Sequence, residues 1–347
     1  MYIRNAWYMA AWSKDLAAAP HALTMLGEPL VLYRDDAGRP VALEDRCCHR
    51  LAPLSHGRVE GADIRCLYHG LKFAPDGACN EMPGHSAIPK AMRVRAYPVA
   101  ERHSAIWVWM GDPAGADAAL IADFRGPDHP DWAMLPGRMD YDADYRLIQD
   151  NLLDLSHVPY VHRASFGRSD PHINDAWARA AVHVTPLPNG VHVTRWMTGV
   201  PAQPFLSLPE GSRADVLNAY DYLVPGVFLL TTRHYPAGTA QRSPLDAPDD
   251  VPLFTTFSCQ AVTPLTARSA CYFFAYGPWT RHPDAAAMKD GYAKLALQAF
   301  NEDKTLIEAQ QRIIDADPSR RMTLFDVDRA PVQYNRLAAS LMEQEQH

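Results

Sequence analysis

Short apolar runs separated by turns fill the first third of the sequence. The runs are rich in β-branched and aromatic residues, and Gly, Pro and Asp stand between them, as in strands joined by tight turns. The clearest runs are Pro29–Tyr33, Val41–Leu43, Ile64–Cys66, Gly70–Phe73 and Ile106–Trp109. The pattern predicts a small all-β domain over residues 1–115, with a long connection near residues 111–130.

The remaining residues, 116–347, mix strand and helix patterns. Alternating apolar and polar positions predict strands within residues 182–197 and 254–276. The strongest helical stretch covers residues 285–316, where apolar side chains recur every three or four positions. The fold class expected for the whole chain is therefore α+β, with an all-β first domain.

The composition is that of a folded protein without a strong charge bias. Of the 347 residues, 48% are hydrophobic, which suffices for a large core, and the length favours two domains. The net charge of −7 gives no basic footprint, so we expect no nucleic-acid partner. The N-terminus lacks the pattern of a signal peptide, and the longest apolar run, Leu223–Leu230, is too short to span a bilayer. We expect a cytoplasmic protein with no membrane partner.

Two short motifs each pair a cysteine with a histidine. Cys47 and His49 form the first, and Cys66 and His69 form the second after sixteen intervening residues. One thiolate and one imidazole from each of two loops suit a [2Fe–2S] cluster with two cysteines on one iron and two histidines on the other. Structural zinc is the alternative, but zinc fingers usually take two cysteines from one loop and two histidines from another.

The other four cysteines have no role in this motif. Cys48 stands between two proposed ligands and should point away from them. Cys79, Cys259 and Cys271 have no ligand spacing around them and are expected in the core. Without a secretion signal, six cysteines in so long a chain do not indicate a disulfide framework.

A second group of candidate ligands lies near the middle of the chain. Asn151, Asp154 and His157 are three residues apart, so on a helix they would share roughly one face. Pro159 is expected to break that helix and let His162 turn back toward the same point. Two imidazoles and one carboxylate form the ligand set of mononuclear non-haem Fe(II) oxygenases. By itself, the pattern also suits histidines that are only surface or hydrogen-bonded structural residues.

Taken together, these motifs resemble the Rieske non-haem iron oxygenases, specifically the vanillate O-demethylase and dicamba-demethylase-like group of oxygenase components. The resemblance covers nearly the whole chain. Beyond the cluster motif it includes Asn5–Tyr8, Met82–Gly84, Ile106–Trp109, Asp144–Arg146, Asp150–His162 and Glu302–Asp303. It implies a Rieske [2Fe–2S] domain over residues 1–115 and a helix-grip (START/SRPBCC-like) catalytic domain over residues 116–347, assembled as a homotrimer.

The resemblance also implies roles for individual residues. The cluster ligands would be Cys47, His49, Cys66 and His69, and the iron-binding histidines would be His157 and His162. Asp154 would bridge His69 of one subunit to an iron-binding histidine of the next, as a carboxylate that orients an imidazole and offers an electron path. Asn151 would lie close to the iron.

The third iron ligand is expected on the helix at residues 285–316. If Ala299 marks the centre of its apolar stripe, Asp303 lies about 40° away, Glu302 about 60° away on the other flank, and Glu308 about 180° away facing solvent. A carboxylate on an apolar face is costly unless it is paired or binds metal. A buried pair with Arg312 or another basic residue is the alternative. We predict Asp303 as the ligand, and the family pattern agrees.

Three residues are candidates for contact with the substrate. Gln260 lies on an expected strand where a dicamba-type relative would carry a histidine, so this sequence departs from that pattern. Arg233 and His234 are candidates for binding a carboxylate, Arg through a bidentate fork. Either residue is equally well explained as a surface residue.

The resemblance implies a monooxygenase that uses O₂ and takes electrons from a separate NAD(P)H-dependent reductase of the flavin or ferredoxin type. Nothing in the sequence resembles a nicotinamide or flavin site. The expected reaction is O-demethylation of a methoxylated aromatic acid such as vanillate, with release of formaldehyde. Hydroxylation of an aromatic ring, a methyl group or another small cyclic substrate is the alternative. An electron carrier would need only the first domain.

Overall fold

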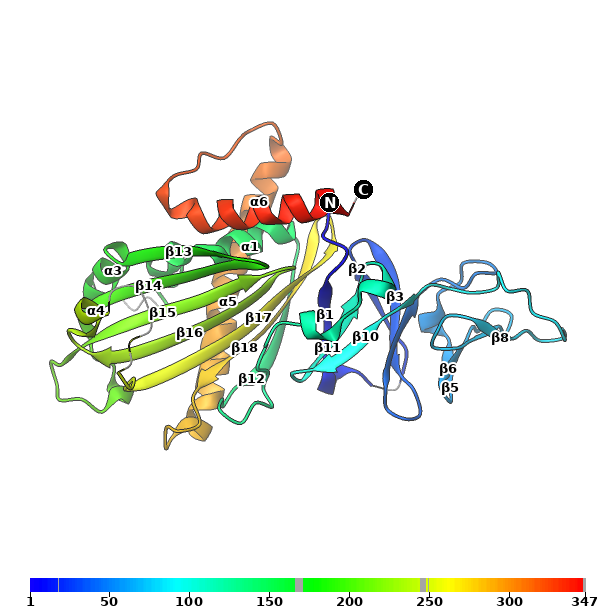
Figure 1. The fold of residues 1–347 in the computed structure, drawn as a ribbon, viewed down its shortest axis with the longest axis horizontal. Coiled ribbons are helices and arrows are strands. Elements are labelled where there is room, and N and C mark those ends of the chain that lie inside the picture. Colours follow the sequence, from blue (N-terminus) through cyan, green and yellow to red (C-terminus); the bar gives the residue numbers. More distant parts are fainter. Residues whose placement is uncertain (18, 166–170, 244–247, 249, 346–347) are drawn as a thin grey trace. The chain divides into compact units, whose positions relative to one another are not determined.

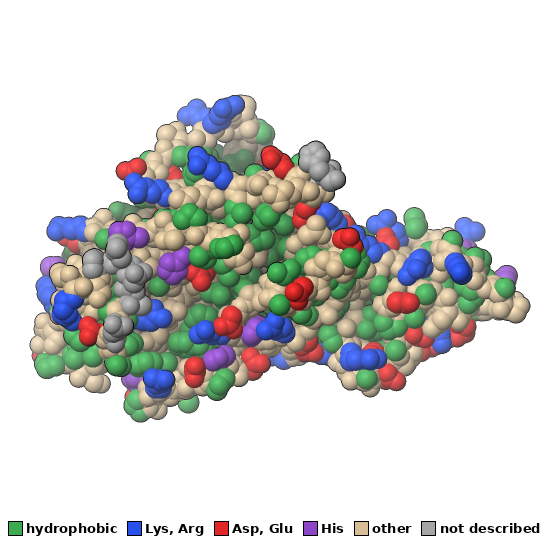
Figure 2. Space-filling view, in the orientation of Figure 1, with side chains coloured by type: hydrophobic (Ala, Val, Ile, Leu, Met, Phe, Trp, Pro, Cys, Tyr) green, Lys and Arg blue, Asp and Glu red, His purple; other side chains and the backbone are tan. Residues whose placement is uncertain are grey.

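The computed structural model describes the chain except residues 18, 166–170, 244–247, 249 and 346–347. It divides into two compact units (Figure 1). Unit 1 contains residues 1–121 and 263–270, and unit 2 contains residues 122–262 and 271–347. On the face that Figure 2 presents, acidic and basic side chains are interspersed. None of the helices in the described part of the chain is both long enough and apolar enough to cross a membrane.

Unit 1 is built from three small antiparallel sheets, as the short apolar runs predict. The first has the order β1 (Trp7–Trp12), β11 (Ala105–Trp109), β10 (Val99–Arg102). The second has the order β2 (His21–Met25), β3 (Glu28–Arg34), β4 (Pro40–Glu44), β9 (Ala96–Tyr97). The third has the order β5 (Arg58–Glu60), β6 (Asp63–Arg65), β7 (Lys72–Phe73), β8 (Cys79–Glu81). The last two sheets enclose a core that includes Val31, Tyr33, Leu43, Ile64 and Phe73.

Residues from the second half of the chain complete unit 1. The tip of a long hairpin, residues 263–270, belongs to this unit. Leu26 and Gly27 donate their N–H groups to the carbonyls of Pro264 and Leu265, at 3.0 and 2.8 Å. Thr263 Oγ1 donates to the carbonyl of Met9 at 2.6 Å. The short runs near the N-terminus therefore pair with a segment more than two hundred residues away in sequence.

Unit 2 contains a seven-stranded sheet with one long helix against it. The strand order is β12 (Leu135–Tyr141), β18 (Ser269–Pro278), β17 (Phe254–Thr266), β16 (Val227–Pro236), β15 (Arg213–Leu223), β14 (Gly190–Pro201), β13 (Ala181–Leu187). Helix α5 (Ala285–Ala316) has the bounds that its periodicity predicts. Its Phe300 ring packs edge-on against Tyr272 and Phe274 of β18, with centroids 5.1 and 4.8 Å apart. The long helix held against an antiparallel sheet confirms the α+β prediction.

The remaining helices of unit 2 are shorter. They are α1 (Tyr145–Leu153), α2 (Val158–Val161), α3 (Pro171–Ala178), α4 (Thr239–Arg242) and α6 (Arg329–Gln344).

The segment with the candidate iron ligands is not one helix broken at Pro159. Helix α1 already ends at Leu153, because Asp154 has extended backbone angles (φ −124°, ψ 102°). The Asp154 carboxylate then caps a short 3₁₀ turn, Leu155–His157, by accepting the Ser156 N–H at 2.9 Å. Pro159 lies in the first turn of α2, where a missing N–H breaks no helical hydrogen bond. The predicted common helical face of Asn151, Asp154 and His157 is therefore wrong.

Candidate metal centres and substrate cavity

The two cysteine–histidine loops of unit 1 share one backbone pattern. In each loop the cysteine donates its N–H to the carbonyl five residues later and accepts the N–H of the residue four positions later. The bonds are Cys47 N to Ala52 O, 2.8 Å, Leu51 N to Cys47 O, 2.9 Å, Cys66 N to Leu71 O, 2.8 Å, and Gly70 N to Cys66 O, 3.1 Å. The fourth residue is left-handed in both loops, Leu51 at φ 58° and Gly70 at φ 76°. The repeat gives the two loops equivalent geometry.

The four candidate cluster ligands separate into a buried pair and an exposed pair. The Cys47 and Cys66 side chains are buried, and burial, with the neighbouring Cys66 thiol adding to it, raises the pKa of Cys47 to about 11. The His49 and His69 rings are exposed and lie with their centroids 4.6 Å apart. Two sulfurs on one side and two imidazoles on the other fit a cluster with two differently ligated irons. The pairing does not suit one zinc ion, which needs four ligands around one point.

The other cysteines are buried or half-buried. Cys79, Cys259 and Cys271 are buried, as expected for core residues. Cys48 is half-buried and packs against the core of unit 1.

A second candidate centre lies in unit 2, where three side chains converge. Among the residues that the structure describes, only His157, His162 and Asp303 place three possible ligand atoms within 4.8 Å of one another. His157 Nε2 is 3.5 Å from Asp303 Oδ1, and His162 Nε2 is 3.3 Å from Asp303 Oδ2. Asp303 is buried on α5, on the apolar face where the sequence predicts it.

Each histidine has its second ring nitrogen fixed by a partner. His157 Nδ1 donates to the main-chain carbonyl of Asp154 at 2.8 Å, and His162 Nδ1 bonds to Glu302 Oε2 at 2.9 Å. With the protons on Nδ1, both Nε2 lone pairs face the Asp303 carboxylate. Acceptors that face one another across 3.3–3.5 Å repel unless a proton or a metal cation lies between them. This donor set fits a divalent iron ion.

The two imidazoles have different electrostatic surroundings. Burial lowers the pKa of His157, and Asp303 only partly offsets that effect. Burial also disfavours the charged form of His162, but Asp303 and Glu302 outweigh it and raise the His162 pKa. Glu302 also accepts a hydrogen bond from Ser165 Oγ at 2.7 Å. One histidine is therefore held by a neutral carbonyl and the other by a carboxylate.

Asn151 and Asp154 lie beside this centre. Asn151 Nδ2 donates to Asp303 Oδ1 at 3.1 Å and is 3.4 Å from His157 Nε2. The Asp154 carboxylate accepts from Ser156 and lies 3.6 Å from the Arg195 guanidinium. Within the chain it is therefore the Asp154 carbonyl, and not its carboxylate, that orients His157.

Two sequence-based expectations concern other charged residues on α5. Arg312, the alternative partner of Asp303, is exposed, and Asp303 instead contacts Asn151 and the two histidines. The expectation that Glu308 faces solvent is wrong, because it accepts the Asp142 N–H at 3.0 Å and its side chain is only 19% exposed.

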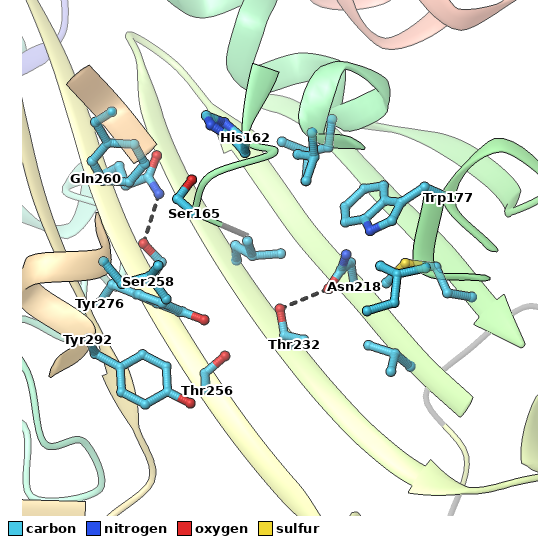
Figure 3. A pocket seen from close by; sticks show the side chains of 18 of the residues that line it. His162, Ser165, Trp177, Asn218, Thr232, Thr256, Ser258, Gln260, Tyr276 and Tyr292 are labelled. Carbon is cyan, nitrogen blue, oxygen red and sulfur yellow. Dashed lines mark hydrogen bonds between the residues drawn. The ribbon is translucent and has the colours of Figure 1, made fainter. Parts of the chain in front are cut away.

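The three converging side chains line a cavity of about 540 Å³. Figure 3 shows this cavity with His162 labelled. The sheet forms one wall through every second residue of three neighbouring strands, because alternate strand residues share a face. These residues are Val216 and Asn218 on β15, Phe228, Leu230, Thr232 and His234 on β16, and Thr256, Ser258 and Gln260 on β17. The strands are in register, so Asn218 pairs with Thr232 and Thr232 with Thr256.

Because alternate strand residues face opposite sides of the sheet, only some of the three candidate substrate residues can line the cavity. His234 and Gln260 line the cavity, whereas Arg233 lies between two lining residues and so belongs to the opposite face of β16. Burial lowers the pKa of His234 to about 4, so its imidazole is neutral at pH 7. The described lining residues include neither Lys nor Arg.

Several side chains of this site were not singled out by the sequence. Glu302 was placed only on the flank of the apolar stripe, and its contact with His162 joins positions 140 residues apart. Asn218, Thr232 and Ser258 also line the cavity.

Comparison with known proteins finds one family in each part of the chain. Residues 6–98 match the family described as Rieske [2Fe-2S] domain. Residues 141–344 match the family described as Vanillate O-demethylase oxygenase C-terminal domain. The expected domain boundary at residues 115 and 116 falls between the two matches and stays a prediction.

Individual relatives extend over almost the whole chain. The iron-sulfur subunit of a toluene-4-sulfonate monooxygenase system from Comamonas testosteroni is 39% identical over 94% of this chain and 93% of its own. A vanillate O-demethylase oxygenase subunit from Pseudomonas sp. is 32% identical over 100% of this chain and 96% of its own. A crystal structure of dicamba monooxygenase bound to 3,6-dichlorosalicylic acid superimposes with a TM-score of 0.87, at 31% identity, covering 99% of this chain and 98% of that one.

The paired cysteine–histidine loops, the converging histidines and carboxylate, and these full-length similarities have one common explanation. This chain belongs to the Rieske non-haem iron oxygenases, in the group of the vanillate O-demethylase and dicamba monooxygenase oxygenase components.

Proposed function

We propose that the chain is the terminal oxygenase component of an aryl-ether O-demethylase acting on a small methoxylated aromatic acid. The observation that carries the proposal is the pair of histidines and the carboxylate at the wall of a largely apolar cavity. A cavity of about 540 Å³ has the size of a small-molecule site.

We further propose which residues hold the two metal centres. His157, His162 and Asp303 would bind Fe(II), and Cys47, His49, Cys66 and His69 would bind the [2Fe–2S] cluster. When bound, these centres supply electrons and the activation of O₂. The electrons come from a separate reductase, because the chain is an oxygenase component.

The side chains around the iron ligands would keep the site organised. The Asp154 carbonyl and Glu302 hold the protons of His157 and His162 on Nδ1, so that the Nε2 atom of each ring would be the one that binds metal. Asn151 donates to Asp303 Oδ1 and so limits how that carboxylate turns. The apolar residues Phe228 and Leu230 would pack against an aromatic ring and exclude water.

The proposed reaction hydroxylates the methyl carbon of the ether. Aryl–O–CH₃, O₂, two electrons and two protons give aryl–O–CH₂OH and water. The hemiacetal then loses its hydroxyl proton, the C–O bond to the ring oxygen breaks, and a phenol and formaldehyde leave.

Hydroxylation of an aryl methyl group is a second candidate, and the toluene-4-sulfonate monooxygenase relative favours it. The attacked carbon is then bonded to the ring and not to oxygen. The product is a stable benzyl alcohol, and formaldehyde is not released. The two candidates therefore differ in a product that is easily measured.

Electron transfer between subunits is also a proposal. In a homotrimer, Asp154 would connect His69 of one subunit to His157 of the next. We expect Asp154→Ala to retain both metal centres and to lose substrate-dependent turnover, measured as product formed after reduction of the cluster. Unchanged turnover would rule out the bridge.

The test of the proposed reaction uses iron-loaded protein, NADH and a surrogate reductase. Vanillate, syringate, 4-methoxybenzoate and toluene-4-sulfonate are offered one at a time, and formaldehyde and O₂ are recorded. Formaldehyde near one per O₂ with a methoxybenzoate supports O-demethylation. A benzyl alcohol from toluene-4-sulfonate, without formaldehyde from any methoxybenzoate, contradicts it in favour of methyl hydroxylation.

A further inference from the structure

A buried arginine on β14 belongs to the side of the sheet that faces the cavity. Arg195 pairs across the strands with Asn218, and residues paired in this way share one face of a sheet. Asn218 lines the cavity, whereas Arg195 is not among the described lining residues and so lies behind them. The Arg195 side chain is only 5% exposed. Arginine is rarely buried so completely unless it is paired.

The Arg195 guanidinium lies between Trp177 and Asp154. Its central carbon is 5.3 Å from the centre of the Trp177 ring, which is within the range of a cation–π interaction. Trp177 belongs to α3 and lines the cavity, where Figure 3 shows its ring. On the other side, Arg195 Nη2 is 3.6 Å from Asp154 Oδ1. Arg195 therefore connects a wall of the cavity with the turn that begins at Asp154.

The surroundings of Arg195 compensate its charge only in part. Its Nε is buried and has no hydrogen-bond partner within the described part of the chain. The 3.6 Å between Arg195 and Asp154 is too long for a hydrogen bond. Burial lowers the pKa of Arg195, and the nearby Tyr220 and Asp154 only partly offset that effect. Burying a charge with so few partners costs free energy, so a gain in stability does not explain this residue.

Asp154 links this ion pair to a candidate iron ligand. Its carboxylate accepts from the N–H and the hydroxyl of Ser156, at 2.9 and 2.6 Å, and so holds the turn Leu155–His157. Its carbonyl accepts from His157 Nδ1 at 2.8 Å. Because one residue fixes both the turn and the ring, a displacement of Asp154 changes the position of His157.

We propose that Arg195 is a positioning residue that holds Asp154, and through Asp154 the His157 ring, in a fixed place relative to Trp177. This inference rests on the proposed function, because it takes the cavity to be the substrate site and His157 to be an iron ligand. A substrate that packs against Trp177 changes the surroundings of the Arg195 charge. Because charges interact strongly where water is excluded, the ion pair carries that change to the turn that holds His157.

The test uses the holoenzyme with an oxidised cluster and Fe(II), without substrate or reductant. Nitric oxide is added, and the electron paramagnetic resonance spectrum of its complex with the mononuclear iron reports the geometry of the iron ligands. The oxidised cluster contributes no signal. We expect Arg195→Gln to shift this spectrum, because Asp154 and His157 take a new position. Arg195→Lys keeps the charge and should restore much of the wild-type spectrum.

The same variants are compared for Fe(II) affinity, starting from iron-depleted protein. Arg195→Gln should weaken Fe(II) binding about 10-fold, the low end of the range for residues that orient a metal ligand. Circular dichroism checks that each variant is folded, and Arg195→Met, which keeps the aliphatic stem, gives a second neutral variant if Arg195→Gln unfolds.

The connection to the cavity wall is tested with Trp177→Leu, which removes the aromatic ring but keeps an apolar side chain. In protein that retains Arg195, this substitution should shift the spectrum, because the guanidinium loses its cation–π partner. In Arg195→Gln protein the same substitution should add nothing, as expected for two residues that act through one contact. An equal shift in both backgrounds would mean that Trp177 acts without Arg195 and would overturn the inference.

Arg179→Gln is the matched control. Arg179 is an exposed arginine just after α3 that pairs with Asp175 at 3.1 Å, so the substitution removes the same charge without affecting Asp154. Its spectrum should be that of wild-type protein. The inference is overturned if Arg195→Gln gives the wild-type spectrum, or if both glutamine variants shift it equally. Because no turnover is measured, these results are independent of whether formaldehyde is formed, which tests the proposed function.

Discussion

Glu302 is a charged hydrogen-bond partner of His162 but is not one of the three candidate iron ligands. Its carboxylate bonds to His162 Nδ1 at 2.9 Å and accepts from Ser165 Oγ at 2.7 Å. A carboxylate in this position fixes the ring and makes the far nitrogen a stronger donor to metal. We therefore expect Glu302→Gln to weaken Fe(II) binding about 10- to 100-fold.

The measurement is Fe(II) affinity of the iron-depleted protein, with the visible spectrum of the Rieske cluster as a check of folding. Asp290→Asn, an exposed carboxylate on the same helix, is the control and should leave the affinity unchanged. Equal affinity of Glu302→Gln and wild-type protein would mean that the hydrogen bond alone, which Gln can keep, positions His162.

The contrast between Asp303 and Glu302 shows what a sequence can predict about single residues. Asp303 was predictable because burying a carboxylate on an apolar helix face costs free energy unless the carboxylate is paired or binds a metal. Glu302 was not, since its role depends on a contact across 140 positions of sequence. Arg233 and His234 are neighbours in sequence, and only the face of β16 decides which of them lines the cavity.

At the scale of elements, the two cluster loops have one backbone shape but different residues at the left-handed position. Gly70 has φ +76°, and a Cβ there would lie 2.9 Å from Pro83 Cγ. We expect Gly70→Ala to cost about 1–2 kcal/mol for the backbone conformation, with a further cost for moving Pro83. The measurement is the temperature at which the absorbance of the Rieske cluster is lost.

Gly38 supplies the control for Gly70. It has φ +79° in a turn of the same unit, but a Cβ there would meet nothing within 4 Å. Gly38→Ala should therefore show the backbone cost alone and a smaller fall in temperature. Equal falls for the two variants would contradict a role for the Pro83 contact.

The contact between α1 and α6 gives a prediction about pH. Asp150 accepts a hydrogen bond from Asn335 Nδ2 at 3.3 Å, and burial raises the Asp150 pKa from 3.8 to about 6. The folded protein thus binds this proton more tightly than the unfolded chain, so unfolding becomes easier as pH rises from about 4 to 6. Asp150→Asn keeps the acceptor and should stabilise the protein by about 1–3 kcal/mol at pH 7.5.

Thermal unfolding of wild-type protein and Asp150→Asn at pH 7.5 and pH 4 measures this difference, which should nearly vanish at the lower pH. Asp142→Asn removes an exposed carboxylate just before the same helix and should have little effect at either pH. A gain for Asp150→Asn of the same size at both pH values would exclude the buried charge as its cause.

Elements with strong local signals were predicted well, and connections were not. The bounds of α5 follow from an apolar period sustained over 32 residues. The end of α1 at Leu153 depends on Asp154 capping the next turn, and a local pattern cannot distinguish this from a helix that continues to Pro159. Within α5, Ile307 is buried whereas Ile313 is exposed, so the apolar side chains of this helix do not all lie on its buried face.

At the scale of the whole molecule, the two candidate metal centres lie in different units with separate cores. A mild Fe(II) chelator should remove the mononuclear iron through the cavity, because the His157 side chain is 19% exposed there. Turnover should be lost while the electron paramagnetic resonance of the reduced Rieske cluster stays. Added Fe(II) should restore turnover, and a parallel loss of both signals would contradict independent centres.

The part of unit 1 that comes from residues 263–270 affects how this protein can be made and recombined. On a ribosome, the first 121 residues emerge long before Pro264 and Leu265, which accept the N–H groups of Leu26 and Gly27. The folding of unit 1 therefore cannot be completed until most of unit 2 has been synthesised. A chimera that exchanges only the N-terminal segment with a relative would pair foreign strands with a native hairpin tip, so a functional exchange has to carry residues 263–270 along.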